Sequence, residues 1–204
     1  MKDYYFIFNG NDYVLHSIMP EITRGKSRVS DWGHSEKNLY HPESYEAVEI
    51  QLDSAYAPFD DPKFYEKTLK LANYNSQAIE LDKEMKQAKS SMAIYSDRYS
   101  EYSRNEYQES KEKYENTQAE LEALKSKVEK LVEEIKAETQ KTPSFIGFKA
   151  RHKYRANNNA GNTVFGMQLF LFDKEISSII TSYDMDAEEY QLVQQWYKLM
   201  VEGY

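Results

Sequence analysis

The fold of this chain is decided by residues 62–141, which read PKFYEKTLKLANYNSQAIELDKEMKQAKSSMAIYSDRYSEYSRNEYQESKEKYENTQAELEALKSKVEKLVEEIKAETQK. Core-type residues recur there at steps that alternate between three and four, which is the spacing of a coiled-coil heptad repeat. A step of five separates two such series. Their members are Leu71, Tyr74, Ala78, Leu81, Met85, Ala88, Met92, Tyr95, Tyr99 and Tyr102, then Tyr107, Ser110, Tyr114, Thr117, Leu121, Leu124, Val128, Leu131 and Ile135.

The two series are mirror images about the register break at residues 103–106. Tyr102 faces Tyr107 in this scheme, and Met85 faces Leu124. An antiparallel helical hairpin requires such symmetry, so we predict an antiparallel coiled-coil arm over 62–141 with its tip near 103–106. Each helix would be roughly 57 Å long. The alternative is one continuous helix that dimerises, which would separate the flanking segments by roughly 120 Å.

The arm has clear boundary signals at both ends. Asp61-Pro62 is a good helix start, because aspartate accepts hydrogen bonds from exposed amide groups and proline tolerates the first helical position. No glycine or proline follows until Pro143. Proline disfavours helix in the residue before it, so we expect the arm to end near Thr142.

The segments that flank the arm predict a small antiparallel sheet. Before the arm, strand patterns on either side of Asn9-Gly10 indicate a hairpin, because this dipeptide favours a tight two-residue turn. Residues 20–45 look irregular, and 57–61 look like a loop. The expected strands are Asp3–Phe8, Asp12–Met19 and Glu46–Leu52, then Phe145–Ala156, Val164–Phe172 and Ile176–Ser182, with turns at 157–162 and 173–174.

A helix that opens at 184–189 is expected to cover this sheet. Tyr190, Val193, Trp196 (or Tyr197) and Met200 lie on one face at helical spacing. The predicted fold is therefore α+β: a small antiparallel sheet with a C-terminal helix, interrupted by the coiled-coil hairpin. Residues 1–61 form the first part of this body. Residues 142–204 form the second part, a three-stranded meander plus a helix.

Composition places few further limits on the chain. It has 204 residues, a net charge of −8, 40% hydrophobic residues and no cysteine, so it offers neither a disulfide framework nor a thiolate metal site. No apolar leader and no run of about 18 apolar residues is present. We therefore expect a cytoplasmic chain without membrane contact, unless it is a processed fragment of a secreted protein.

The strand at 149–155 carries one candidate site. Successive strand side chains point to opposite faces, so four cations share one face while Ala150, His152 and Tyr154 share the other. The chain's own carboxylates could neutralise these cations, as could an acidic partner protein or nucleic-acid phosphate. The four cations are Lys149, Arg151, Lys153 and Arg155.

The expected tip of the arm carries the other candidate site. Its seam turns from aliphatic residues to tyrosine, and tyrosine and arginine are enriched at binding hot spots. A frayed, wetter tip is the competing interpretation. The predicted partner-binding residues are Tyr95, Arg98, Tyr99, Tyr102, Arg104 and Tyr107.

Nothing in the sequence indicates catalysis. No phosphate-binding glycine loop, nucleophile elbow or cysteine nucleophile is present. His34 and His41 with Glu36 match no established metal motif, and His152 looks like a satisfied core histidine. We therefore expect no metal and no cofactor.

We accordingly predict a non-enzymatic, regulatory protein, such as an inhibitor or adaptor. It would engage a partner protein through the tip of the arm and the basic face of 149–155. The alternative is a nucleic-acid-binding protein that contacts the phosphate backbone through that basic strand. Self-association through the arm is a further expectation.

Overall fold

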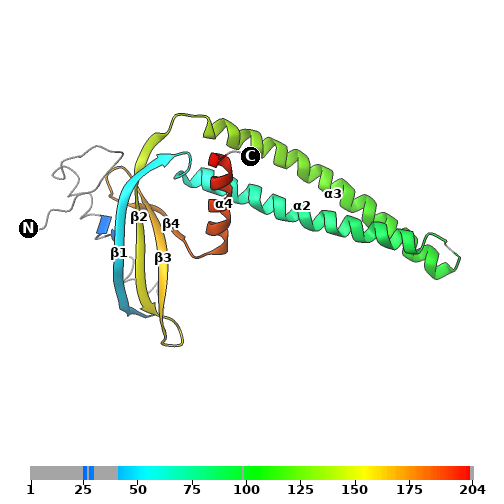
Figure 1. Cartoon of the computed structure of the whole chain (residues 1–204), viewed down its shortest axis with the longest axis horizontal. Coiled ribbons are helices and arrows are strands. Elements are labelled where there is room, and N and C mark those ends of the chain that lie inside the picture. The colour runs from blue at the N-terminus through cyan, green and yellow to red at the C-terminus, as the bar shows by residue number, and fades with distance from the viewer. Residues whose placement is uncertain (1–24, 27, 30–40, 98, 203–204) are drawn as a thin grey trace, which may run out of the picture. The chain divides into compact units, whose positions relative to one another are not determined.

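The computed structural model describes residues 25–26, 28–29, 41–97 and 99–202. Within them the chain is mixed α+β, with one antiparallel four-stranded sheet and three helices (Figure 1). The strands predicted at 3–8 and 12–19 lie outside the described residues. The elements are β1 (His41–Ala57), α2 (Pro62–Ile94), α3 (Glu101–Thr139), β2 (Ser144–Asn157), β3 (Thr163–Phe172), β4 (Ile179–Asp184) and α4 (Glu188–Glu202).

The chain divides into two compact units, and α4 contributes to both. The sheet unit comprises Met1–Pro62 and Pro143–Gln194, and the helical unit comprises Lys63–Thr142 and Gln195–Tyr204. No helix in the described part of the chain is both long enough and apolar enough to cross a membrane.

The sheet has the strand order β1-β2-β3-β4, and every neighbouring pair is antiparallel. β1 pairs with β2 from His41↔Asn157 to Ala57↔Ser144. β1 therefore runs well beyond the strand predicted at 46–52, and the expectation that 41–45 is irregular was wrong. The reason is tertiary: β2 offers pairing partners along the whole of β1, and this overrides the weak local pattern.

One face of the sheet carries the core of its unit. This core joins Val29, Ala150, Phe170, Phe172 and Ile176, none of which is more than 1% exposed. Alternation along β2 and β3 places these side chains on one face, as the pattern of 149–155 predicted. Ile50, Leu52 and Phe148 pack against the same core.

The turn between β3 and β4 is longer than the predicted two residues. The Asp173 carboxylate accepts hydrogen bonds from the Ser177 amide at 2.7 Å and the Ser178 amide at 3.0 Å. Ile176 is buried with φ at 51°. β4 consequently begins at Ile179 and ends at Asp184, which corrects the strand expected at 176–182.

The two long helices confirm the predicted start and correct the predicted tip. α2 begins at Pro62 and ends at Ile94, and α3 begins at Glu101. Residues 103–106 thus lie inside α3, not at a turn. The break falls at 95–100, because the Ser100 hydroxyl accepts from the Ser103 amide at 3.0 Å and so starts a new helix.

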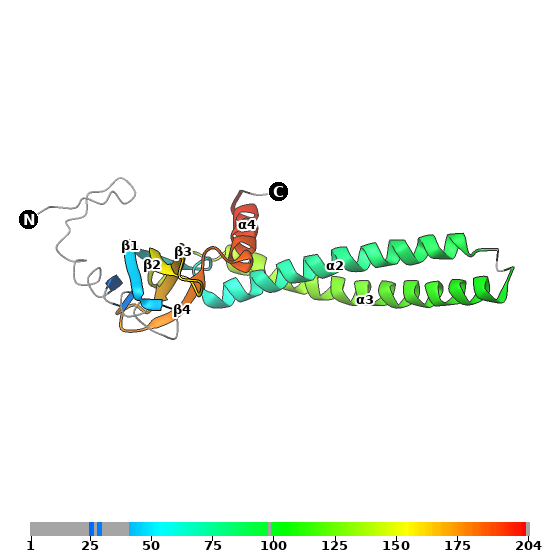
Figure 2. The same cartoon turned by 90° about the horizontal axis from the view of Figure 1, so that it is seen from below.

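α2 and α3 lie side by side and run in opposite directions in both views (Figures 1 and 2). Ion pairs join them: Lys67 Nζ lies 2.6 Å from Glu138 and 3.3 Å from Glu134, and Lys113 Nζ lies 3.4 Å from Glu84. The predicted series from Leu71 to Tyr95 and from Tyr107 to Ile135 coincide with buried or half-buried positions. Buried members are Leu71, Ala88, Thr117, Leu124, Leu131 and Ile135.

The structure of α4 decides which of Trp196 and Tyr197 belongs to its buried apolar face. Tyr190, Val193 and Tyr197 are buried, while Trp196 is half-buried. In the sheet unit the Tyr190 ring lies 6.2 Å from that of Tyr183, and in the helical unit the Tyr197 ring lies 5.6 Å from that of Phe64. The apolar face of α4 therefore contributes a buried aromatic residue to each unit.

Candidate interaction surfaces

The turn that joins α2 to α3 is built around two tyrosines. Tyr95 follows the last residue of α2, and Tyr102 lies in the first turn of α3. Their rings meet edge to face, with centroids 5.9 Å apart, an arrangement that aromatic pairs favour. A hydrogen bond with Tyr95, together with the charge of Glu106, raises the pKa of Tyr102 to about 12. The Tyr102 hydroxyl therefore remains neutral and able to donate.

Large apolar side chains point into solvent around this turn. Ile94 is 71% exposed, Tyr99 93% and Tyr102 62%. We call these three residues the tip patch. Packing of the helical pair does not account for them, because they lie outside the buried seam. Tyrosine is among the residue types enriched at binding hot spots.

The other predicted tip residues divide between surface and helix packing. Arg104 is exposed on α3, Tyr107 is half-buried, and Arg98 lies outside the described residues. Tyr102 and Tyr107 belong to one helix, so they are not facing partners as the mirror scheme expected. Sequence reasoning missed Ile94 because it is not a member of either heptad series.

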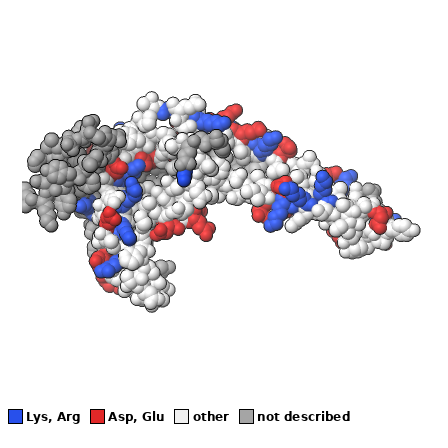
Figure 3. Space-filling view, in the orientation of Figure 1, with Lys and Arg blue, Asp and Glu red and all other residues white. Residues whose placement is uncertain are grey.

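Three of the four basic residues of β2 lie opposite acidic residues of β1, and Arg151 lies opposite Gln51. The register pairs Lys149 with Asp53, Lys153 with Glu49, and Arg155 with Glu46. Figure 3 shows Lys and Arg interspersed with Asp and Glu over the strands. The cations therefore lie within a mixed-charge surface and do not form an isolated positive stripe.

Two of the four cations bind carboxylates of the same chain. Lys149 Nζ lies 2.8 Å from both carboxylate oxygens of Asp60, with the two side chains 25% and 17% exposed. The Arg155 guanidinium donates to Glu46, with Nε at 2.8 Å. These pairs match the hypothesis that the chain's own carboxylates neutralise the strand. The acidic stretch Asp60-Asp61 could have suggested Asp60, but only the fold shows that it meets Lys149.

The other two cations have different surroundings. The Lys153 ammonium lies 5.6 Å from the centroid of the Phe165 ring, a cation–π contact, and its side chain is exposed. Arg151 is also exposed. Burial raises the pKa of Tyr190, and the charge of Arg151 offsets part of that rise. Among the described residues, no carboxylate lies within ion-pair distance of Arg151 or Lys153, the other two members of the predicted basic site.

His152 lies on the opposite face of β2 and is fully buried. Its Nδ1 lies 3.1 Å from the Glu49 carbonyl oxygen and its Nε2 lies 2.9 Å from the Tyr45 hydroxyl. The Tyr154 ring stacks on the imidazole with centroids 5.4 Å apart. Both ring nitrogens are therefore bonded, which is the satisfied core histidine that the sequence indicated. Tyr45 was missed because the sequence placed it in an irregular segment.

Metal-ligating side chains do not converge in the part of the chain that the structure describes. Across 41–97 and 99–202, with residues 25–26 and 28–29, no three His, Asp or Glu side chains are placed to hold an ion. His34 and Glu36, considered with His41 as metal ligands, lie outside the described residues. Comparison with protein-family models, curated proteins and solved structures yields no match for this chain.

Proposed function

We propose that this chain is a non-enzymatic interaction protein that binds a partner protein through the tip patch, Ile94, Tyr99 and Tyr102. In this proposal α2 and α3 form an antiparallel coiled-coil hairpin inserted into the α+β body. The protein would act as an inhibitor or adaptor in the cytoplasm. The observation that carries the proposal is the 93% exposure of Tyr99 beside a fixed aromatic pair.

Two physical arguments support this choice. The first is that exposing a large apolar side chain gains nothing for the fold, whereas burying it against a partner contributes roughly 1.5–3 kcal/mol. The second is that the Tyr95–Tyr102 contact joins the two ends of the turn and that the Ser100 cap fixes the start of α3. A preorganised surface loses less conformational entropy on binding than a mobile one.

The test is a pull-down from lysate of the source organism, followed by titration of each captured protein in purified form. Wild type is compared with Tyr99→Ala/Tyr102→Ala and with Phe165→Ala, which removes from the sheet unit an aromatic as exposed as Tyr102. We expect at least a tenfold loss of affinity for the tip variant and none for Phe165→Ala. Equal affinity for all three proteins would refute the proposal.

Nucleic-acid binding through β2 is less well supported, because Lys149 and Arg155 already have carboxylate partners. The pull-down is therefore repeated with nuclease, and with Arg151→Glu/Lys153→Glu. Suppose that binding disappears with nuclease, falls steeply with salt and is lost in this variant. The binding surface would then be the basic strand and not the tip patch.

The hairpin itself can be tested with introduced cysteines, since the chain has none of its own. Glu84→Cys/Lys113→Cys places two thiols where an ion pair joins α2 to α3. A short bifunctional maleimide should then link them within one chain. Links only between chains would instead support the continuous, dimerising helix, and sedimentation analysis of the same protein reports self-association.

A further inference from the structure

The start of β1 is held to β2 by few ladder pairs. The register shifts between His41 and Glu46, and again between Ala47 and Glu49. Such irregularities leave residues without backbone partners. Side-chain hydrogen bonds therefore supply part of the attachment of residues 41–47 to β2.

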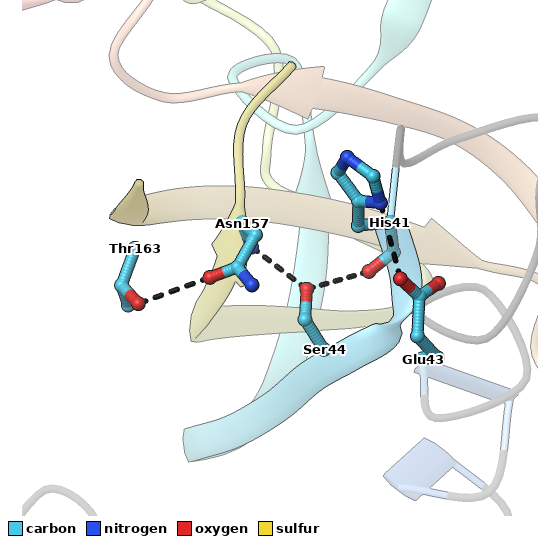
Figure 4. Close-up of polar contacts among 5 residues, drawn as sticks. All are labelled: His41, Glu43, Ser44, Asn157 and Thr163. Atoms are coloured by element: carbon cyan, nitrogen blue, oxygen red, sulfur yellow. Dashed lines mark hydrogen bonds and ion pairs between the residues drawn. The ribbon is translucent and has the colours of Figure 1, made fainter. Parts of the chain in front are cut away.

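One such attachment is a small polar cluster (Figure 4). The Ser44 hydroxyl donates to the His41 carbonyl at 2.6 Å and accepts from the Asn157 amide at 2.7 Å. His41 Nδ1 also lies 3.1 Å from Glu43, but that pair stays within β1 and does not bridge strands. The cluster fixes the very beginning of the strand.

The second attachment is the hydrogen bond between Tyr45 and His152, and it depends on one protonation state. A backbone carbonyl only accepts, so the Nδ1 that lies 3.1 Å from the Glu49 oxygen must carry the hydrogen. In the neutral ring Nε2 is then an acceptor, and the Tyr45 hydroxyl donates to it at 2.9 Å. A proton added at Nε2 abolishes that acceptor, so the Tyr45 hydroxyl would have to turn and accept from a buried cation.

The surroundings of the imidazole disfavour its protonated form. His152 is fully buried, with Tyr154 stacked on one side and the Phe170 ring centroid 6.3 Å away. An imidazolium without water costs free energy unless a carboxylate pairs with it. Burial accordingly lowers the pKa of His152, outweighing the bond to the Glu49 carbonyl.

The titratable groups around the ring come from three elements. From β1 the Tyr45 hydroxyl contacts the ring, while the Glu49 carboxylate accepts from the Gln51 amide. From β2 Tyr154 stacks on it, and the carboxylates of Asp184, at the end of β4, and Asp186, in the turn that follows, act on Tyr154. Among the described residues, no carboxylate forms an ion pair or a hydrogen bond with the imidazole, whose partners are the Tyr45 hydroxyl and the Glu49 carbonyl oxygen.

We propose that Tyr45 and His152 form an acid-sensitive latch: protonation of the buried imidazole releases the start of β1, residues 41–47, from β2. The neutral ring is stable in the closed sheet, whereas the charged ring is favoured where water reaches it, which requires the start of β1 to separate from β2. The latch is engaged above about pH 6.5, the ordinary pKa of histidine. It opens progressively as the pH falls below that value, by up to about tenfold in the local opening constant per pH unit.

Hydrogen exchange on the full chain between pH 7.5 and 5 tests this inference. Protection of the amides at 44–47 and 154–157, corrected for intrinsic exchange, should fall with acid while the β3–β4 amides at 168–172 stay constant. In His152→Phe the acid dependence of 44–47 should disappear. Glu46→Gln controls for the nearby carboxylate and should keep the wild-type response. A flat wild-type profile, or an unchanged slope in His152→Phe, would overturn the latch.

A second measurement keeps the inference testable if His152→Phe does not fold. Nitrogen NMR of the labelled imidazole in the wild-type chain reports its tautomer and its titration. We expect the hydrogen on Nδ1 at pH 7.5 and a titration midpoint below 6.5. A hydrogen on Nε2, or a midpoint at or above 6.5, would exclude the mechanism.

Discussion

The Lys149 ammonium lies 2.8 Å from both carboxylate oxygens of Asp60, a residue 89 positions earlier in the chain. Asp60 also accepts from the Tyr56 amide at 2.8 Å, so one carboxylate joins β2 to the end of β1 and to the turn that follows it. Neither side chain is more than 25% exposed. Loss of one partner therefore leaves the other charge largely out of water.

Asp60→Asn should destabilise the sheet unit by about 1–3 kcal/mol, because a partly buried ammonium loses its counter-charge. Urea unfolding measures the change. Glu46→Gln serves as the control, since its pair with Arg155 is about half exposed and should be worth less than about 1 kcal/mol. Equal losses of unfolding free energy in the two variants would show that the lower exposure of the Lys149–Asp60 pair does not make it more stabilising than the Arg155–Glu46 pair.

Leu124→Ala should destabilise the helical unit by about 2–4 kcal/mol, because Leu124 is only 7% exposed in α3. Ile79→Ala is the matched control, since Ile79 is 59% exposed on α2 and should cost less than about 1 kcal/mol. Helix melting followed by circular dichroism gives both values. A small loss for Leu124→Ala would mean that the seam is loosely packed.

Ser100→Ala should cost about 1 kcal/mol, because it removes the cap that starts α3. Ser90→Ala is the control: its hydroxyl bonds the Lys86 carbonyl within α2, where alanine is the better helix former. The same melting experiment compares them. If the proposed function is right, Ser100→Ala should also weaken partner binding, since the turn that carries Tyr99 frays.

Gly147→Ala should prevent stable folding or cost about 3 kcal/mol or more. A Cβ at this position would lie 2.0 Å from the Phe172 carbonyl oxygen, and φ is +154°. The strands β2 and β3 would have to separate to admit it. Expression level and urea unfolding report the effect, and a variant as stable as wild type would show that the strands do not approach so closely.

Asp173 should make the β3–β4 turn sensitive to strong acid. Hydrogen bonds from Ser177 and Ser178 lower the pKa of its carboxyl from 3.8 to about 2. Because the folded value is depressed, the turn gains stability above pH 3.8 and loses it as the pH falls from there towards 2. Exchange of the Ser177 and Ser178 amides should follow this range, and Asp173→Asn should abolish the dependence.

The sequence predicted the helices better than their junction. Pro62 starts α2 as expected, and the periodic positions coincide with the covered face. The break was misplaced because the tyrosine series continues through Tyr99 and Tyr102, where it outweighs the weaker signal of Ser100. A capping box usually has Glu or Gln three residues after the cap, whereas this one has a serine there. The pattern is therefore hard to recognise in the sequence.

The strands show the same division between local and distant causes. Alternation at 149–155 correctly placed Ala150 and His152 inside, because strand period is a local property. The length of β1 depended on β2, and the start of β4 depended on a side-chain turn at Asp173. Contacts such as Lys149 with Asp60 join residues far apart in the chain, so no local pattern could have indicated them.

The pairing of Ala57 with Ser144 also bears on how the chain folds. These neighbours in the β1–β2 ladder enclose residues 58–143, so forming the ladder first would close a very long loop. By the logarithmic dependence of closure entropy on loop length, that step costs about 4 kcal/mol. Helices form in about 0.1–1 microsecond from contacts near in the chain, so α2 and α3 need no such closure. If α2 and α3 pair first, the effective length of that loop falls, and the helices that lie between β1 and β2 in the sequence would thereby help these two strands to find each other.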